Sequence, residues 1–178
     1  ILTNDQSAEG NERQAAVLVK LGNYYRNNRK NFAEAEKRYQ AAVAALSNTR
    51  SAQSTLYGEA LTKLGSLYAR ELQKPAEGEK FLKDAIGYLS MVRLSEKSTA
   101  QVLGELAALY SQQARFAEAI EASKRKLEVA STLLARTSVK GTGIDKWNAE
   151  EYTDAFSVYI RTVLVLAKDH KAAGDAQS

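Results

Sequence analysis

Residues 18–42 read LVKLGNYYRNNRKNFAEAEKRYQAA and decide the fold of this chain. In the first half, apolar and small residues recur at spacings of three and four, as on one face of a helix. These residues are Leu18, Leu21, Gly22 and Tyr25. The polar run at 27–30 interrupts the pattern, and Asn31 can cap a second helix with Glu34 three residues later. The stretch therefore predicts two helices joined by a short turn.

The first-helix pattern returns twice along the chain. It reads Leu-x2-Leu-Gly-x2-Tyr at 18–25 and 61–68, and Leu-x2-Leu-Ala-x2-Tyr at 103–110. The small residue inside the pattern recurs after 43 and then 42 residues. A second small residue follows each Tyr, at Ala35, Gly78 and Ala119. We expect the small residues to let paired helices approach closely and each Tyr to fill the wedge between them.

This pattern resembles the tetratricopeptide repeat, in which W-x2-L-G-x2-Y is followed by A-x3-F and then P. Leu replaces the Trp in every unit, the closing Pro is missing, and the period exceeds the common 34 residues. A period near 42 is similar to that of the long-repeat subfamily found in kinesin light chains and bacterial repeat proteins. The resemblance implies an all-α, right-handed α-solenoid, because each hairpin must stack on the next to bury both faces.

The repeat divides the chain into segments. Three hairpins are expected at residues 11–48, 51–93 and 95–135, after a flexible lead-in at 1–10. The turn-rich residues 136–147 predict a loop. Residues 148–178 predict a C-terminal helix that carries Phe156 and Ile160 inward and half of a fourth unit, from Val163 to His170. That helix either caps the array or has lost its partner. The third unit departs most from the pattern, since Lys126 stands where Ala is expected.

Composition bounds the class of protein. The formal net charge is +4, spread along the chain without a basic stripe, so we expect no nucleic-acid role. The absence of Cys excludes disulfides, thiol nucleophiles and Cys-based metal sites. No apolar run is long enough to span a membrane. We expect a soluble protein, cytoplasmic or exported, and the start at Ile1 indicates a processed or excised chain whose targeting segment would be absent.

The sequence offers little for catalysis. The one His, His170, stands in a packing position and has no second His or Cys to join it. The Gly141-x-Gly143 pair follows no strand and reads as a loop rather than a phosphate site. Glu residues recur on the second helices as a solvated face. We therefore expect no enzyme activity, no cofactor and no metal.

The outward positions are the better place to look for function. In the family that this pattern resembles, the first helix of each hairpin lines a concave groove. Carried over by position, the groove residues are Lys20, Asn23, Asn27, Lys63, Ser66, Arg70, Gln101, Glu105 and Gln112. The first two units present a basic, amide-rich wall that suits an extended peptide with acidic groups.

Three functions remain open at this point. The first is a protein–protein interaction scaffold that holds a peptide or partner subunit in the groove. The second is an assembly subunit, including a homo-oligomer, that uses the C-terminal helix, with Trp147, Val163 and Leu164 as its candidate interface. The third is a regulatory domain that senses a peptide.

Overall fold

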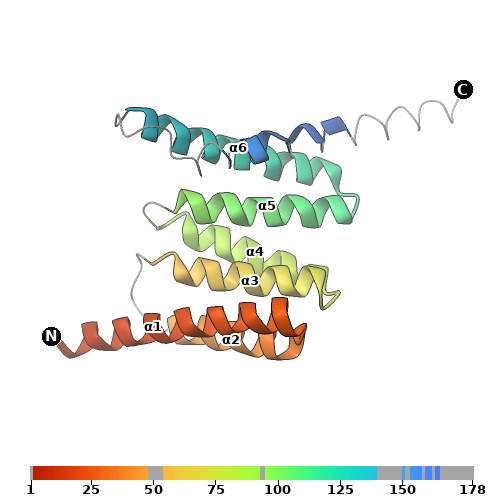
Figure 1. The fold of residues 1–178 in the computed structure, drawn as a ribbon. Helices are drawn as coiled ribbons and strands as arrows, with labels where there is room; N and C mark the ends of the chain where they lie inside the picture. The colour runs from red at the N-terminus through yellow and green to blue at the C-terminus, as the bar shows by residue number, and fades with distance from the viewer. Residues whose placement is uncertain are drawn as a thin grey trace, which may run out of the picture. The chain divides into compact units, whose positions relative to one another are not determined.

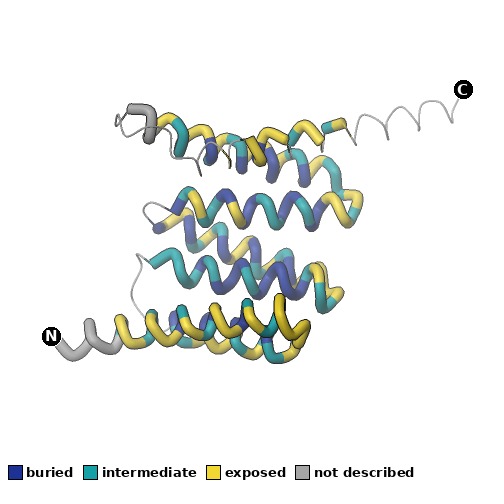
Figure 2. The backbone as a smooth tube through the Cα atoms, viewed as in Figure 1, coloured by how far each residue is buried: buried dark blue, intermediate teal, exposed yellow. Residues whose placement is uncertain are grey.

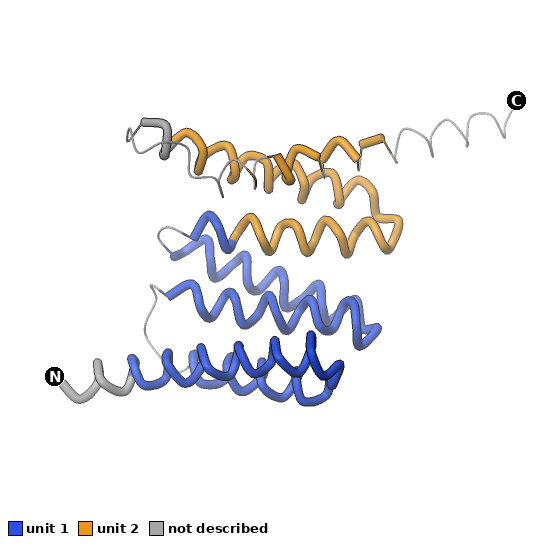
Figure 3. The backbone as a smooth tube through the Cα atoms, viewed as in Figure 1, with its two compact units in different colours: residues 1–98 blue, residues 99–178 orange. Residues whose placement is uncertain are grey.

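The computed structural model describes residues 2–47, 54–92, 95–139, 150, 153–157, 159–161 and 163–164. Every secondary-structure element within these ranges is helical, which confirms the all-α prediction (Figure 1). The chain divides into two compact units, residues 1–98 and 99–178, which we describe separately (Figure 3). None of the described helices has the length and apolar character needed to cross a membrane.

The first unit contains two helical hairpins. Helix α1 (Leu2–Tyr24) continues into a π-helical turn, η1 (Tyr25–Arg29), and packs against α2 (Phe32–Ser47). Helix α3 (Leu56–Arg70) packs against both α2 and α4 (Pro75–Leu89). Helices α2, α3 and α4 lie within the ranges expected for the first two hairpins, residues 11–48 and 51–93.

Helix α1 begins earlier than expected. Residues 2–10, predicted as a flexible lead-in, are helical. The helix continues through Gly10, and the ion pair between Arg13 Nη2 and Glu9 Oε2, 2.8 Å long, spans this glycine. Such i, i+4 pairs support a helix where propensity is weak.

Each hairpin turn is closed by a non-glycine residue with positive φ. The φ angles are 52° at Lys30, 55° at Gln73 and 56° at Ala114. This left-handed conformation commonly ends a helix, although glycine is its usual occupant. Asn31 caps α2 as predicted, since its Oδ1 accepts the backbone N–H of Glu34 at 3.1 Å. Pro75 is the first residue of α4, and the sequence predicts a helix start there because the fixed φ of Pro suits a first helical turn.

Two glycines set the distance between α3 and α4. A Cβ added to Gly78 would lie 2.8 Å from the backbone oxygen of Gly65, and one added to Gly65 would lie 3.0 Å from that of Gly78. Backbone atoms cannot rotate away as side chains do, so both positions need glycine. In the first hairpin, a Cβ at Gly22 would overlap the buried ring of Tyr39. The predicted role of small residues in close packing is confirmed at these positions.

The buried face of α1 differs from that of α3. Leu21, predicted to face inward, is 39% exposed, whereas its equivalent Leu64 in α3 is only 1% exposed. Leu64 packs in a cluster with Ala35 and Tyr39 of α2, the helix before α3. None of the described helices covers the same face of α1, and Val19 is buried instead. Figure 2 shows the contrast, with α3 mostly buried and α1 largely exposed.

The second unit holds most of α5 (Glu96–Gln112), followed by α6 (Phe116–Val139). Helix α6 runs through residues 136–139, where a loop was predicted, because no Gly or Pro interrupts the chain before Gly141. The rest of the predicted loop, residues 140–149, lies outside the described residues.

Lys126 ties α6 to the last helix. Its side chain is buried, and Nζ lies 2.5 Å from Oδ2 of Asp154. The equivalent residues of the first two hairpins are Ala42 and Ala85, both fully buried. Gly104 on α5 lies beside this side chain, and a Cβ added there would be in ordinary van der Waals contact, 3.5 Å from Lys126 Nζ.

The last helix is rotated relative to the prediction. Residues 153–157, 159–161 and 163–164 are helical, and Ala155 is fully buried. Phe156 and Ile160, predicted to face inward, are 48% and 39% exposed. The ion pair of Asp154 with Lys126 turns the Asp154–Ala155 side toward α6, so the bulky residues lie on another face.

Candidate partner-binding surface

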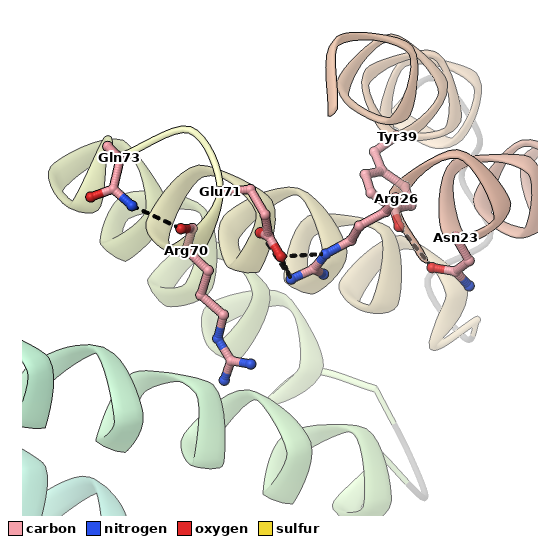
Figure 4. A network of polar contacts seen from close by, with 6 residues as sticks. All are labelled: Asn23, Arg26, Tyr39, Arg70, Glu71 and Gln73. Carbon is pink, nitrogen blue, oxygen red and sulfur yellow. Dashed lines mark hydrogen bonds and ion pairs between the residues drawn. The ribbon is translucent and has the colours of Figure 1, made fainter. Parts of the chain in front are cut away.

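A polar network joins the two hairpins of the first unit (Figure 4). Arg26 lies in η1, and Glu71 is the C-cap of α3. Arg26 donates from Nε and Nη2 to Oε1 of Glu71 at 3.0 and 2.9 Å, and from Nη2 to Oε2 at 3.0 Å. The two side chains are only 15% and 22% exposed. Both carboxylate oxygens are therefore engaged, and the charge of Glu71 is compensated locally.

Tyr39 is held beside this ion pair. Its ring is fully buried, and its hydroxyl donates to Oδ1 of Asn23 at 2.7 Å. Burial raises the pKa of Tyr39 above the ordinary 10.0, because an apolar environment disfavours the phenolate. The Arg26 guanidinium opposes part of that rise, since a nearby positive charge favours the phenolate. Asn23 is thus engaged in the packing of the first hairpin.

A second polar contact fastens α2 to α3. The hydroxyl of Tyr68 donates to Oε1 of Glu36, and Nε2 of Gln40 donates to that hydroxyl at 3.3 Å. The hydrogen bond to the Glu36 carboxylate is the main reason that the pKa of Tyr68 is raised, with burial second. Lys74 Nζ lies 5.5 Å from the centroid of the Tyr68 ring. Tyr39 and Tyr68 thus each combine a packed ring with a hydrogen-bonded hydroxyl.

The predicted groove residues of the first unit fall into two groups. Asn23 is bonded to Tyr39, and Ser66 is buried at 3% exposure, so neither offers much surface to a partner. The others are half-buried or exposed. They are Lys20, Asn27, Lys63 and Arg70.

Arg70 occupies the last turn of α3, next to Glu71. Figure 4 shows its side chain directed away from the Arg26–Glu71 pair. Its backbone oxygen accepts Nε2 of Gln73 at 3.0 Å, which steadies the end of the helix. The guanidinium therefore stands apart from the carboxylate that lies next to it in the sequence.

The remaining predicted residues belong to the second unit or lie outside the described residues. On α5, Gln101 and Gln112 are exposed and Glu105 is half-buried. On the last helix, Val163 is half-buried and Leu164 is 56% exposed. Trp147 and His170 lie outside the described residues.

Sequence reasoning missed the Arg26–Glu71 pair. The repeat pattern could not reveal it, because the residues equivalent to Glu71 are the uncharged Asn28 and Gln113. The available signal was a departure from the repeat. Arg26 directly follows the repeat residue Tyr25, and Glu71 lies three residues after the repeat residue Tyr68. Because stacked hairpins place equivalent positions side by side, these opposite charges are expected at the same end of the two hairpins.

Within the residues that the structure describes, no group of three or more His, Asp or Glu side chains is placed to hold a metal ion.

Comparison with models of known protein families and with curated proteins found no match.

Proposed function

We propose that this chain is a tetratricopeptide-like scaffold, a right-handed α-solenoid, that binds an acidic segment of another protein. The proposal starts from the repetition of one helical hairpin at spacings of 43 and 42 residues. In such arrays, packing fixes the inward residues and leaves the outward residues of each unit available for recognition. No reaction is proposed for the chain.

The observation that carries the proposal is the charge balance on the first helices of the first unit. Lys20, Lys63 and Arg70 are cationic and at least partly exposed, on helices α1 and α3, which contact each other. Glu71, the carboxylate next to Arg70, is already engaged by Arg26. Exposed Asn27 adds an amide to this basic surface. A carboxylate-bearing peptide can form charge-assisted hydrogen bonds with it.

Charge reversal on the first helices tests the proposal. The variant Lys20→Glu, Lys63→Glu and Arg70→Glu changes the formal charge from +4 to −2. A matched control reverses two Lys and one Arg that are exposed on the second helices α2, α4 and α6. The control substitutions are Lys37→Glu, Lys80→Glu and Arg125→Glu.

The measurement is fluorescence anisotropy with a labelled, extended Asp/Glu-rich peptide. Reversal on the first helices should weaken binding by about tenfold or more, and the control should change it only through net charge. Binding by the unmodified chain should also weaken as salt rises. Equal loss in both variants would show that net charge, rather than this surface, attracts the peptide.

One observation favours a second function, that of an assembly subunit. Leu164 on the last helix is 56% exposed, and Phe156 and Ile160 are exposed beside it. A run of exposed large apolar side chains commonly marks a contact surface between proteins.

A further inference from the structure

Helix α1 presents an exposed apolar stripe. Val17, Leu21 and Tyr24 are 56%, 39% and 45% exposed, and their spacing of four and three residues places them on one face. We call these three residues the α1 stripe. The equivalent residues of the later first helices are all buried. They are Ala60, Leu64 and Leu67 in α3, and Val102, Leu106 and Leu109 in α5.

The equivalent face of α3 shows which kind of contact the α1 stripe can make. Leu64 and Leu67 are buried in one cluster with Ala35 and Tyr39 of α2. That face is therefore the one on which another helix stacks. The α1 stripe repeats its position with side chains that are larger or similar in size, yet it faces solvent. By continuity with the α2–α3 interface, the α1 stripe is a helix-stacking face.

The last helix carries a second exposed apolar stripe. Phe156, Ile160 and Leu164 are spaced four residues apart and are 48%, 39% and 56% exposed. We call them the last-helix stripe. The opposite side of this helix is already used, because Asp154 pairs with Lys126 and Ala155 is buried. At 1.5 Å per residue, the α1 stripe is about 10 Å long and the last-helix stripe about 12 Å.

The charges beside the α1 stripe are positive, whereas those on the last helix are balanced. Lys20 is exposed within the α1 stripe, and the Arg29 guanidinium lies 5.9 Å from the centroid of the Tyr24 ring. On the last helix, exposed Glu150 and exposed Arg161 carry opposite charges, and the carboxylate of Asp154 is paired with Lys126. Contact between two copies of the α1 stripe would bring like charges together, whereas contact of the α1 stripe with the last-helix stripe would not.

We propose that the α1 stripe of one copy docks on the last-helix stripe of a second copy, so that copies join head to tail. Such a contact is heterologous, and it forms open chains when its rotation does not close a ring. Each stripe contains only three large side chains, so we expect a weak interface that forms at high protein concentration. This association shares Lys20 with the basic surface, but it does not require a bound peptide.

Two variants of the full chain test the proposal by sedimentation velocity over a range of concentrations. One replaces the α1 stripe (Val17→Ser, Leu21→Ser, Tyr24→Ser). The other replaces the last-helix stripe (Phe156→Ser, Ile160→Ser, Leu164→Ser). The unmodified chain should form species that grow with concentration, and each variant alone should remain a monomer. An equimolar mixture should form a complex of twice the chain mass, because each variant keeps one intact stripe.

The controls distinguish loss of docking from loss of folding and from nonspecific association through exposed apolar side chains. Met91 is 74% exposed and lies outside both stripes, so Met91→Ser should leave the association unchanged. Circular dichroism should show unchanged helix content in all variants, and the single substitution Leu21→Lys replaces the triple variant if that one unfolds.

Three outcomes would overturn the proposal. The first is a strictly monomeric unmodified chain at all concentrations. The second is self-association retained by either variant, which would mean that a stripe pairs with itself. The third is a mixture of folded variants that stays monomeric while the unmodified chain associates.

Discussion

Arg26 and Glu71 form a bidentate ion pair that holds the first hairpin against the end of α3. The guanidinium donates three hydrogen bonds of 2.9–3.0 Å to the carboxylate, and both side chains are mostly buried. Arg26→Lys keeps the charge but loses the planar, two-pronged donor, so it should lower the free energy of unfolding by about 1 kcal/mol. Glu71→Gln should have a larger effect, because it leaves a buried guanidinium without a charged partner. Urea unfolding of both variants measures the difference.

Arg13 supplies the comparison for that measurement. Its ion pair with Glu9 is on the surface, with side chains 80% and 70% exposed. Arg13→Lys should therefore change stability by only a few tenths of a kcal/mol. If the Arg13 and Arg26 variants lose the same stability, the buried bidentate geometry contributes nothing.

The contact between Gly65 and Gly78 predicts a strong position effect on α4. Gly78→Ala should destabilise the first unit by about 2 kcal/mol or more, because its Cβ would meet backbone atoms of α3. Gly87 is exposed on the same helix, and a Cβ there would meet nothing within 4 Å. Gly87→Ala should therefore stabilise the protein by about 0.5–1 kcal/mol. Thermal melts of the two variants should move in opposite directions.

The buried Tyr39 predicts a loss of stability at alkaline pH. Its pKa is raised above the ordinary 10.0, so the unfolded chain loses the phenolic proton before the folded chain does. Stability from this group is fully present below pH 10.0 and falls as pH rises toward the folded-state pKa. Tyr39→Phe loses the hydrogen bond to Asn23, so it should be about 1 kcal/mol less stable at neutral pH.

The pH dependence distinguishes this effect from a general weakening. Above pH 10.0 the gap between Tyr39→Phe and the unmodified chain should narrow, because only the unmodified chain has this phenol to ionise. Urea midpoints measured across that range give the comparison. A constant gap at every pH would contradict the linkage.

The Lys126–Asp154 contact predicts how the last helix is attached. Asp154→Asn leaves the buried ammonium facing a neutral partner, and it should destabilise the second unit by about 1–2 kcal/mol. The effect is smaller than for a fully buried pair, because the Asp154 side chain is 60% exposed. Adding Lys126→Met should recover most of the loss, because an apolar side chain of similar length needs no partner. Backbone amide hydrogen exchange in residues 153–157 should be fastest in Asp154→Asn and slower in the double variant, with the unmodified chain slowest.

Local spacing was sufficient to predict the helices of the first two hairpins, but not where α1 begins or where α6 ends. The pairing of small residues with bulky ones, the Asn31 cap and the position of Pro75 depend on residues within a few places of one another. These features were therefore visible in the sequence. The family resemblance and the binding role remain predictions.

Features that depend on neighbours in space were not predictable from spacing alone. Leu21 has the same local pattern as Leu64, but only Leu64 is covered by α2. The spacing of Phe156 and Ile160 predicts that they face inward, but the Asp154–Lys126 ion pair turns another side of their helix toward α6. In the candidate surface, sequence position predicts that the Asn23 amide faces a partner, but its Oδ1 accepts the hydrogen bond of the Tyr39 hydroxyl.

The three residues with positive φ at the hairpin turns are sites where substitution can increase the stability of the protein. Each non-glycine residue held at positive φ costs about 1 kcal/mol. Ala114→Gly should therefore raise the free energy of unfolding by up to about 0.5 kcal/mol, after the added conformational entropy of the unfolded chain is subtracted. Lys30 and Gln73 lie at other turns, so gains there should add to it, although Gln73 would lose its bond to the Arg70 carbonyl. Tip replacements could thus offset destabilising substitutions elsewhere, which leaves the outer surfaces freer to evolve new partners.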